Sequence, residues 1–194
     1  MDNTKNFSSC DVVRTVEING ESLSYRMASG ADIRMGLRPK KFLIDGLIAE
    51  GDIVLISGPS GGCKTTFTDT IGMLVASEGI PAIGLMCKPG PLPVADITCE
   101  DYQGIMRRYV AWNDEYNDGG DLDGFSAAEA IPKIDTEDGL QALIEMLRKK
   151  NLDFKLIILD HLQALMKGDE NSAKDCNKFM DAVVALSRAF NNAT

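Results

Sequence analysis

The sequence is poor in the side chains that build histidine and cysteine sites. Its 194 residues include one histidine, His161, and five cysteines, none of which is spaced as C-x-x-C. A lone histidine leaves no cluster for metal or triad chemistry. Five scattered cysteines predict neither a disulfide framework nor a zinc site.

Positive charge and long apolar runs are also scarce. Twenty Lys and Arg residues stand against 29 Asp and Glu, a net charge of −9, so a generally basic coat for nucleic acid is excluded and any such contact must come from local patches. The first five residues are polar, and no apolar run approaches the roughly 20 residues that span a bilayer. We expect a cytoplasmic protein without a membrane segment. At 44% hydrophobic content the length suits one α/β core.

The most informative stretch is a short apolar run followed by a glycine-rich loop. Residues 53–56 are Ile, Val, Leu and Ile, a pattern typical of a buried parallel strand. After Ser57 come the residues that we predict to cradle phosphate: Gly58, Pro59, Ser60, Gly61, Gly62, Cys63, Lys64, Thr65 and Thr66. The following run to Ala76 predicts a helix, whose N-terminal N–H groups and dipole favour an anion.

Each part of this loop has a physical task. Glycines let the backbone curl round a phosphate, Lys64 reaches the β and γ phosphates, and the Thr65 hydroxyl ligates Mg²⁺. The pattern G-x-x-x-x-G-K-[ST] is broken once, because Cys63 stands where the second glycine belongs. A Cβ there restricts φ or crowds the β-phosphate. The alternative is a glycine-rich turn that happens to precede a lysine.

Two further strands are expected to deliver carboxylates. Residues 155–160 read Lys-Leu-Ile-Ile-Leu-Asp, a strand that ends in Asp160 at the edge where ligands bind in open α/β sheets. Asp160 is predicted to be the Mg²⁺ carboxylate that partners a phosphate loop, or alternatively to cap the next turn. Residues 94–98 form the other strand, despite Asp96 within it, and lead to Glu100, a candidate for orienting the attacking water or a solvated loop acid.

The remaining chain divides into an extension at residues 1–30 and a core at 31–194. Within the extension, residues 12–27 alternate around Asn19-Gly20, which predicts a hairpin pairing Ile18 with Glu21, Val16 with Leu23 and Val12 with Met27. Three helices are predicted in the core by apolar spacing, with inner faces at Ile105, Tyr109, Trp112 and Tyr116; at Leu140, Leu143, Ile144 and Leu147; and at Phe179, Val183, Leu186 and Phe190. Thr136 and Ser172 are the expected N-caps of the last two, and Arg107 and Arg108 are expected to face away from the first stripe.

Taken together, the segments 58–66, 98–101, 156–160 and 168–173 resemble the RepA-type branch of the RecA/DnaB-like P-loop ATPases, found in plasmid and phage replication proteins. The resemblance covers residues 36–194. It implies a mostly parallel sheet flanked by helices, ATP and Mg²⁺ as cofactors, Lys64 and Thr65 in the phosphate loop, Asp160 as the metal carboxylate and Glu100 as the residue that orients water. It also implies a replicative-helicase-like motor that forms a hexameric ring around single-stranded DNA, with the segment after Asp160 facing the channel.

This layout further implies one strand between the phosphate-loop strand and the strand that ends at Asp160, contributed from beyond the helix near Phe190. We therefore expect an incomplete C-terminal part. Residues 53–57 and 155–160 are expected to lie either about 10 Å apart, twice the strand spacing, or directly paired. Two other functions stay open: a nucleotide-binding regulator or defective ATPase without motor activity, and a small-molecule kinase, for which the chain has only the Arg107-Arg108 pair as a lid signal.

Overall fold

The computed structural model describes residues 13–18, 21–26, 29–36, 39–77, 84–85, 90–129, 133–191 and 193–194. The chain forms two compact units, Met1–Lys40 and Lys41–Thr194. In the first unit, β1 (Val13–Ile18) pairs with β2 (Glu21–Arg26), and α1 (Gly30–Gly36) follows. The pairs Ile18 with Glu21 and Val16 with Leu23 confirm the predicted hairpin register. Its turn and the predicted outermost pair, Val12 with Met27, lie outside the described residues.

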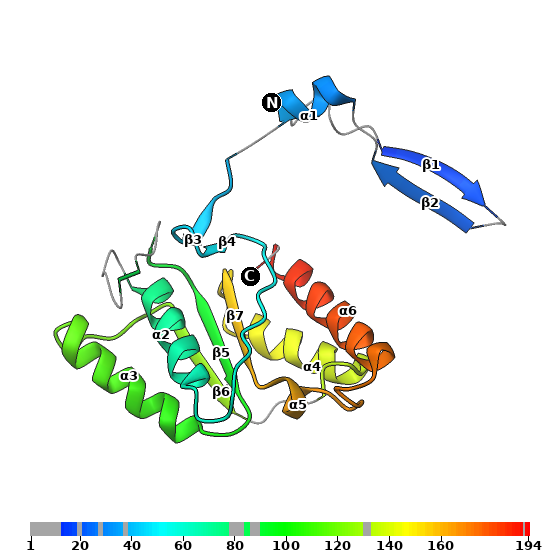
Figure 1. Ribbon diagram of the computed structural model, residues 1–194. Helices are drawn as coiled ribbons and strands as arrows, with labels where there is room; N and C mark the ends of the chain where they lie inside the picture. The colour runs from blue at the N-terminus through cyan, green and yellow to red at the C-terminus, as the bar shows by residue number, and fades with distance from the viewer. Residues whose placement is uncertain are drawn as a thin grey trace. The chain divides into compact units, whose positions relative to one another are not determined.

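The second unit is built on a parallel sheet of three strands, ordered β6-β5-β7 (Figure 1). The central strand β5 (Val94–Thr98) is buried along its whole length, and it pairs with β6 (Phe125–Glu129) and β7 (Leu156–Asp160). The strands β5 and β7 were predicted from their apolar runs and are confirmed. The strand β6 was not, because its sequence, Phe-Ser-Ala-Ala-Glu, carries little β-branched or alternating character.

Helices cover both faces of this sheet. The helices α2 (Lys64–Ala76) and α3 (Tyr102–Tyr116) lie on one face, and α4 (Glu137–Arg148) and α6 (Ala173–Ala189) lie on the other (Figure 1). Alternate residues of β5 serve the two sides, since Val94 packs with the α2 face and Ala95 with the α4 and α6 face. The sheet therefore separates two apolar cores.

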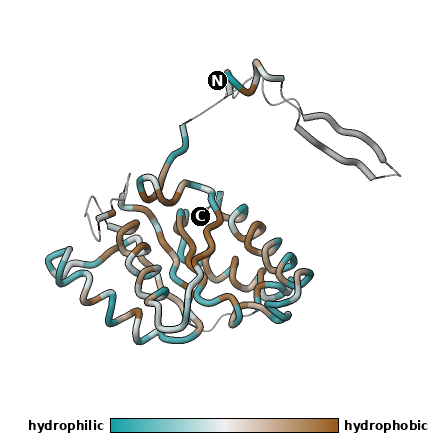
Figure 2. Tube along the Cα trace, in the orientation of Figure 1, coloured by the Kyte–Doolittle hydropathy of each residue, from teal (hydrophilic) through white to brown (hydrophobic). Residues whose placement is uncertain are grey.

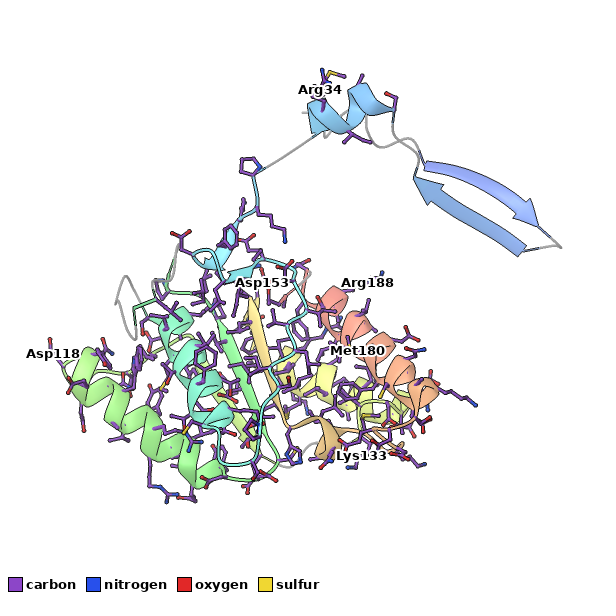
Figure 3. The ribbon with its side chains drawn as sticks, in the orientation of Figure 1. Arg34, Asp118, Lys133, Asp153, Met180 and Arg188 are labelled. Carbon is purple, nitrogen blue, oxygen red and sulfur yellow. The ribbon has the colours of Figure 1, made fainter. Side chains whose placement is uncertain are left out.

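The N-terminal ends of α4 and α6 were predicted correctly from their capping residues. Thr136 Oγ1 accepts a hydrogen bond from the Gly139 N–H (3.2 Å), and Ser172 Oγ accepts one from the Asp175 N–H (3.3 Å), so both predicted N-caps are confirmed. The short helix α5 (Leu162–Leu165) joins β7 to the segment before α6. Lys133, labelled in Figure 3, precedes α4 and donates to the Ala164 carbonyl of α5 (2.5 Å). This bond connects the start of α4 with α5.

The prediction of a buried strand at residues 53–56 is wrong. Two short antiparallel strands, β3 (Phe42–Ile44) and β4 (Ile48–Ala49), precede it, but residues 52–59 form no strand, and Leu55 is 77% exposed. Figure 2 shows the trace of the second unit by hydropathy, with apolar stretches on the strands and on the inner sides of the helices. Apolar composition alone does not make a strand, because a strand also needs a neighbour for its backbone N–H and C=O groups, and none of the described strands pairs with this segment.

On the side of β7 that faces away from β5, Thr194 is the one described residue that hydrogen-bonds to the backbone of the strand. Its N–H donates to the Lys155 carbonyl (3.0 Å) and its carbonyl accepts from the Ile157 N–H (2.7 Å), which is a parallel-strand bond pattern. Its hydroxyl accepts from the Gly51 N–H (3.0 Å) and donates to the Ala49 carbonyl (3.1 Å). Thr194 thus lies between β7 and the turn that enters the phosphate-loop segment. The two segments are not directly paired, which excludes the second of the two expected arrangements.

The predicted inner stripe of α3 is right for Ile105 and Trp112, which are 2% and 5% exposed. It is wrong for Tyr116, which is 41% exposed at the end of the helix, although its ring still contacts Trp112 with centroids 4.6 Å apart. The expectation that Arg108 faces away from the core is also wrong. This side chain turns inward and contacts Asp69 of α2.

Candidate nucleotide-binding site

The phosphate loop connects the unpaired segment to the N-terminus of α2, where backbone N–H groups have no partner one turn earlier. Lys64, the first residue of α2, folds back over the loop and donates to the carbonyls of Gly58 (3.0 Å) and Pro59 (2.9 Å). The Gly62 N–H donates to the same Pro59 carbonyl (3.2 Å). The lysine ammonium therefore lies inside the curl of the loop, where a phosphate would need a counter-charge.

Cys63 adopts the conformation that the motif reserves for glycine. Its φ is 55° and its ψ is 25°, in the left-handed region, where an L side chain is disfavoured by roughly 1–2 kcal/mol. Gly61 also has a positive φ, of 75°. The loop keeps its curled shape because the backbone at residue 63 accepts this strain. Cys63 thus adopts the positive φ despite its Cβ, and the two effects expected of that Cβ, a restriction of φ or crowding of the β-phosphate, stay predictions.

The hydroxyl of Thr65 joins the loop to the sheet. Thr65 Oγ1 donates to Asp160 Oδ2 at 2.6 Å, across 95 residues of sequence. Asp160 ends β7, as predicted, and so lies at the carboxyl edge of the sheet, where α/β proteins bind ligands. The two residues predicted to hold Mg²⁺ are thus brought into direct contact.

Glu100 lies at the same edge. It follows the central strand β5, and its N–H donates to Thr98 Oγ1 (3.4 Å). The neighbouring Cys99 N–H donates to the Asp160 carbonyl (2.9 Å), which holds this turn against the end of β7. The Glu100 carboxylate is exposed and lies 3.6 Å from His161 Nδ1. The four side chains predicted to act on nucleotide therefore come from α2, β7 and the end of β5 and meet at one edge.

A family model described as an AAA domain matches residues 23–194, which is most of the chain. The chain belongs to the AAA domain family. Together with the parallel sheet and its flanking helices, this match gives the fold of a P-loop NTPase and an ATPase-type nucleotide-binding domain. No curated protein and no solved structure matches the chain.

Beneath the loop, the AAA domain buries a group of charged side chains that sequence reasoning did not assemble. Asp96 of β5 is fully buried and Asp69 of α2 is 1% exposed. Burial, reinforced by the charges of Asp69 and Asp160, raises the pKa of Asp96 to about 8. Burial also raises the pKa of Asp69, although its contact with Arg108 opposes the shift. Asp96 therefore holds its proton at neutral pH.

One signal of this group was present in the sequence. Asp96 interrupts an apolar strand, and a buried carboxyl calls for a partner. The charged side chains that act on it were not predictable from spacing, because Asp69 and Arg108 lie on two different helices. His161 was also not predicted as part of the site. It lies near Glu100 at the edge of the sheet and directly follows Asp160 in the sequence.

The donor set of this site fits a magnesium ion that is bound jointly with nucleotide phosphates. Thr65 and Asp160 supply a hydroxyl and a carboxylate oxygen 2.6 Å apart, and Mg²⁺ in such sites takes one or two protein ligands, with phosphate and water completing the shell. The described residues contain no cluster of three or more His, Cys, Asp or Glu side chains suited to a metal. Thr65 and Asp160 are therefore the residues that would hold it.

Among the helices that the structure describes, none has the length and apolar character needed to cross a bilayer. Cys63 and Cys176, in the part of the chain that the structure describes, are free thiols. Neither observation alters the site.

Proposed function

We propose that this AAA domain binds ATP with Mg²⁺ and hydrolyses it. The observation that carries the proposal is the 2.6 Å contact between Thr65 and Asp160, because it joins the end of the phosphate loop to the carboxylate that a P-loop NTPase uses for its metal. A glycine-rich turn without a nucleotide role gives no reason for a strand-terminal aspartate to meet the residue after the lysine.

The proposed roles follow from what phosphoryl transfer requires. Little covalent chemistry is needed, so the domain has to position the reactants and neutralise the developing charge. Lys64 would exchange its loop carbonyls for phosphate oxygens, while the N–H groups of residues 61–66 face the phosphates. Thr65 and Asp160 would hold Mg²⁺, which would supply positive charge to neutralise the phosphates. Glu100, at the end of β5, would orient the attacking water.

We further propose that hydrolysis drives a motor of the RepA-type, RecA/DnaB-like branch on single-stranded DNA, in a ring of identical subunits. The support is the set of motifs named above and an ordered segment after β7. Buried Asp135 accepts from the N–H groups of Lys167 (2.8 Å) and Gly168 (3.1 Å), which fixes the start of residues 168–173. A loop fixed at its base could present its exposed tip to a strand of nucleic acid.

A second candidate is a nucleotide-binding regulator without turnover. It is favoured by two observations, the strained Cys63 in the loop and the exposed, unpaired segment that leads into it. Both lower the precision with which the loop holds a γ-phosphate, and a misplacement of about 1 Å costs on the order of 100-fold in rate.

Two substitutions test the proposal. Lys64→Ala should abolish ATP·Mg binding, because it removes phosphate neutralisation, whereas Glu100→Gln should leave binding intact and remove turnover, because only water orientation is lost. Binding is measured by calorimetry with a non-hydrolysed ATP analogue, and turnover by phosphate release with and without single-stranded DNA. The exposed residues Lys178 of α6 and Glu115 of α3 provide matched controls, as Lys178→Ala and Glu115→Gln.

The outcomes separate the candidates. Hydrolysis stimulated by DNA supports the motor, and tight binding without turnover supports the regulator. Transfer of phosphate to an added small-molecule acceptor would indicate the kinase. If Lys64→Ala binds the analogue as tightly as the parent, the phosphate-loop assignment is wrong.

A further inference from the structure

Arg108 of α3 spans two acidic side chains that belong to different parts of the site. Its Nε lies 2.5 Å from Asp69 Oδ2, and its Nη1 lies 3.7 Å from Asp101 Oδ2. The guanidinium is largely buried, with its side chain 25% exposed, and Asp69 is 1% exposed. One planar group with donors on two sides therefore joins α2 to the N-terminus of α3.

Each of the two acids is close in sequence to a residue with a proposed role in ATP hydrolysis. Asp69 lies one helical turn after Thr65, four residues along α2. Asp101 follows Glu100 directly and caps α3, accepting from the Gly104 N–H at 2.8 Å. Because Arg108 holds both acids, it sets the distance between the phosphate-loop helix and the turn that carries Glu100.

Gly104, which has no Cβ, leaves the space that the Asp101 and Arg108 side chains occupy. A Cβ on Gly104 would lie 1.8 Å from Asp101 Oδ2 and 2.8 Å from Arg108 Nη1. Contacts that short do not occur, so any larger residue at position 104 would displace the bridge. The approach of Asp101 and Arg108 thus depends on a glycine inside a helix, where glycine is otherwise unfavourable by about 1 kcal/mol.

Stability alone is a poor reason for this arrangement. Arg108 Nη2 and Asp69 Oδ1 are buried without a hydrogen-bond partner among the described residues. Unsatisfied buried polar atoms are destabilising, and buried ion pairs replaced by apolar side chains are often no less stable. A role in fixing the geometry of the site would explain a buried ion pair whose polar atoms are only partly hydrogen-bonded.

We propose that Arg108 is a positioning residue, which holds Glu100 at the reacting phosphate by bridging Asp69 and Asp101. The inference rests on the proposed ATPase function and deepens it. Arg108 touches neither nucleotide nor water in this account. Its effect is expected on the turnover step, because the phosphate loop itself keeps all its contacts when the bridge is broken.

The test uses Arg108→Lys, since a lysine keeps the charge beside Asp69 but has only one nitrogen and cannot span both acids. We expect the affinity for a non-hydrolysed ATP analogue to stay within about twofold of the parent, and kcat to fall at least about tenfold, by the sensitivity of rate to small displacements. Arg107→Lys is the matched control. Arg107 is exposed, and its Nη2 lies 3.6 Å from Asp101 Oδ1, the oxygen that accepts from Gly104. Its variant should keep the parental kcat, because a lysine retains the charge and the ion pair that Asp69 makes is with Arg108.

A second variant removes the other end of the bridge. Asp101→Asn keeps an N-cap side chain, because asparagine caps helices as well as aspartate does, but it lacks the charge that Arg108 contacts. Its kcat should fall like that of Arg108→Lys, and the double variant should be no slower than either single one. If Arg108→Lys fails to fold, Asp101→Asn alone decides.

The two proposals fail in different ways. If the parent hydrolyses ATP and both variants keep its kcat, Arg108 is a structural ion pair and the ATPase function stands. If the parent binds the analogue without hydrolysis, amide exchange gives the readout: binding should slow exchange in residues 102–105 of the parent and not of Arg108→Lys, and equal protection would overturn the inference. If the parent does not bind the analogue, the proposed function is wrong, and this inference falls with it.

Discussion

Replacing Asp96 by asparagine should change how the stability of the protein depends on pH. The pKa of Asp96 rises from its ordinary 3.8 to about 8 on folding. An acid of this kind binds its proton more tightly in the folded state, so its contribution is complete below its unfolded pKa and is lost as pH rises through the folded value. Each pH unit within this window is worth about 1.4 kcal/mol for one proton.

From pH 5 to pH 7 the parent should therefore lose about 3 kcal/mol of unfolding free energy through Asp96 alone, a large share of the roughly 5–15 kcal/mol of a typical domain. Asparagine resembles the protonated acid in shape, but it does not titrate. Asp96→Asn should lose correspondingly less. Asp69 and Asp96 act on each other's pKa, so the difference between the two proteins reports the titration of this pair.

Urea unfolding at pH 5, 6 and 7 measures this difference, with the fluorescence of Trp112 as the signal. Trp112 is the one tryptophan of the sequence and is buried on α3. Asp153, labelled in Figure 3, provides the control. Hydrogen bonds from Lys155 and Asn191 lower its pKa, so its contribution is lost only at acid pH, and Asp153→Asn should run parallel to the parent between pH 5 and pH 7. Parallel profiles for Asp96→Asn and the parent would refute the argument, because Asp96 would then not hold its proton in the folded protein.

Two further predictions concern the phosphate loop and the segment before it. Iodoacetamide should alkylate Cys63, which is exposed, and saturating ATP·Mg should slow this reaction because bound phosphate covers the loop. Mass spectrometry of the peptide that contains Cys63 measures the rate of alkylation. A rate that ATP·Mg leaves unchanged would argue against phosphate binding at this loop. Leu55→Ala should lower the unfolding free energy by less than about 0.5 kcal/mol, because Leu55 is 77% exposed. Leu143→Ala, at a site 1% exposed, should cost about 2–5 kcal/mol. Equal losses for these two leucines would mean that Leu55 is buried after all.

Elements with strong local signals were predictable from sequence. The helix α4 has a threonine cap, acids in its first turn and an apolar stripe, and each of these acts within a few residues. The strand β7 is a short apolar run that ends in Asp160, and its place at the sheet edge follows from its direction. For the same reason the positions of Glu100 and Asp160 at one edge were predictable, since the parallel strands β5 and β7 deliver their carboxyl ends there.

The parts that escaped prediction depend on partners distant in sequence. The run at residues 53–56 has the composition of a buried strand, but burial depends on a neighbouring strand, and no described strand occupies that place. Arg108 looked like a solvated charge because its partner, Asp69, is 39 residues away. The strand β6 is held by pairing with β5 rather than by the preferences of its own residues.

The hydrogen bonds of Lys64 to Gly58 and Pro59 change what nucleotide binding means for this loop. The ammonium donates to two carbonyls of its own loop, so a phosphate that binds Lys64 has to compete with these hydrogen bonds. The measured affinity is then a difference between two sets of bonds, smaller than the phosphate contacts alone would give. It follows that Lys64→Ala removes two hydrogen bonds within the loop together with the proposed phosphate contact, so this substitution alters the shape of the loop as well as its charge.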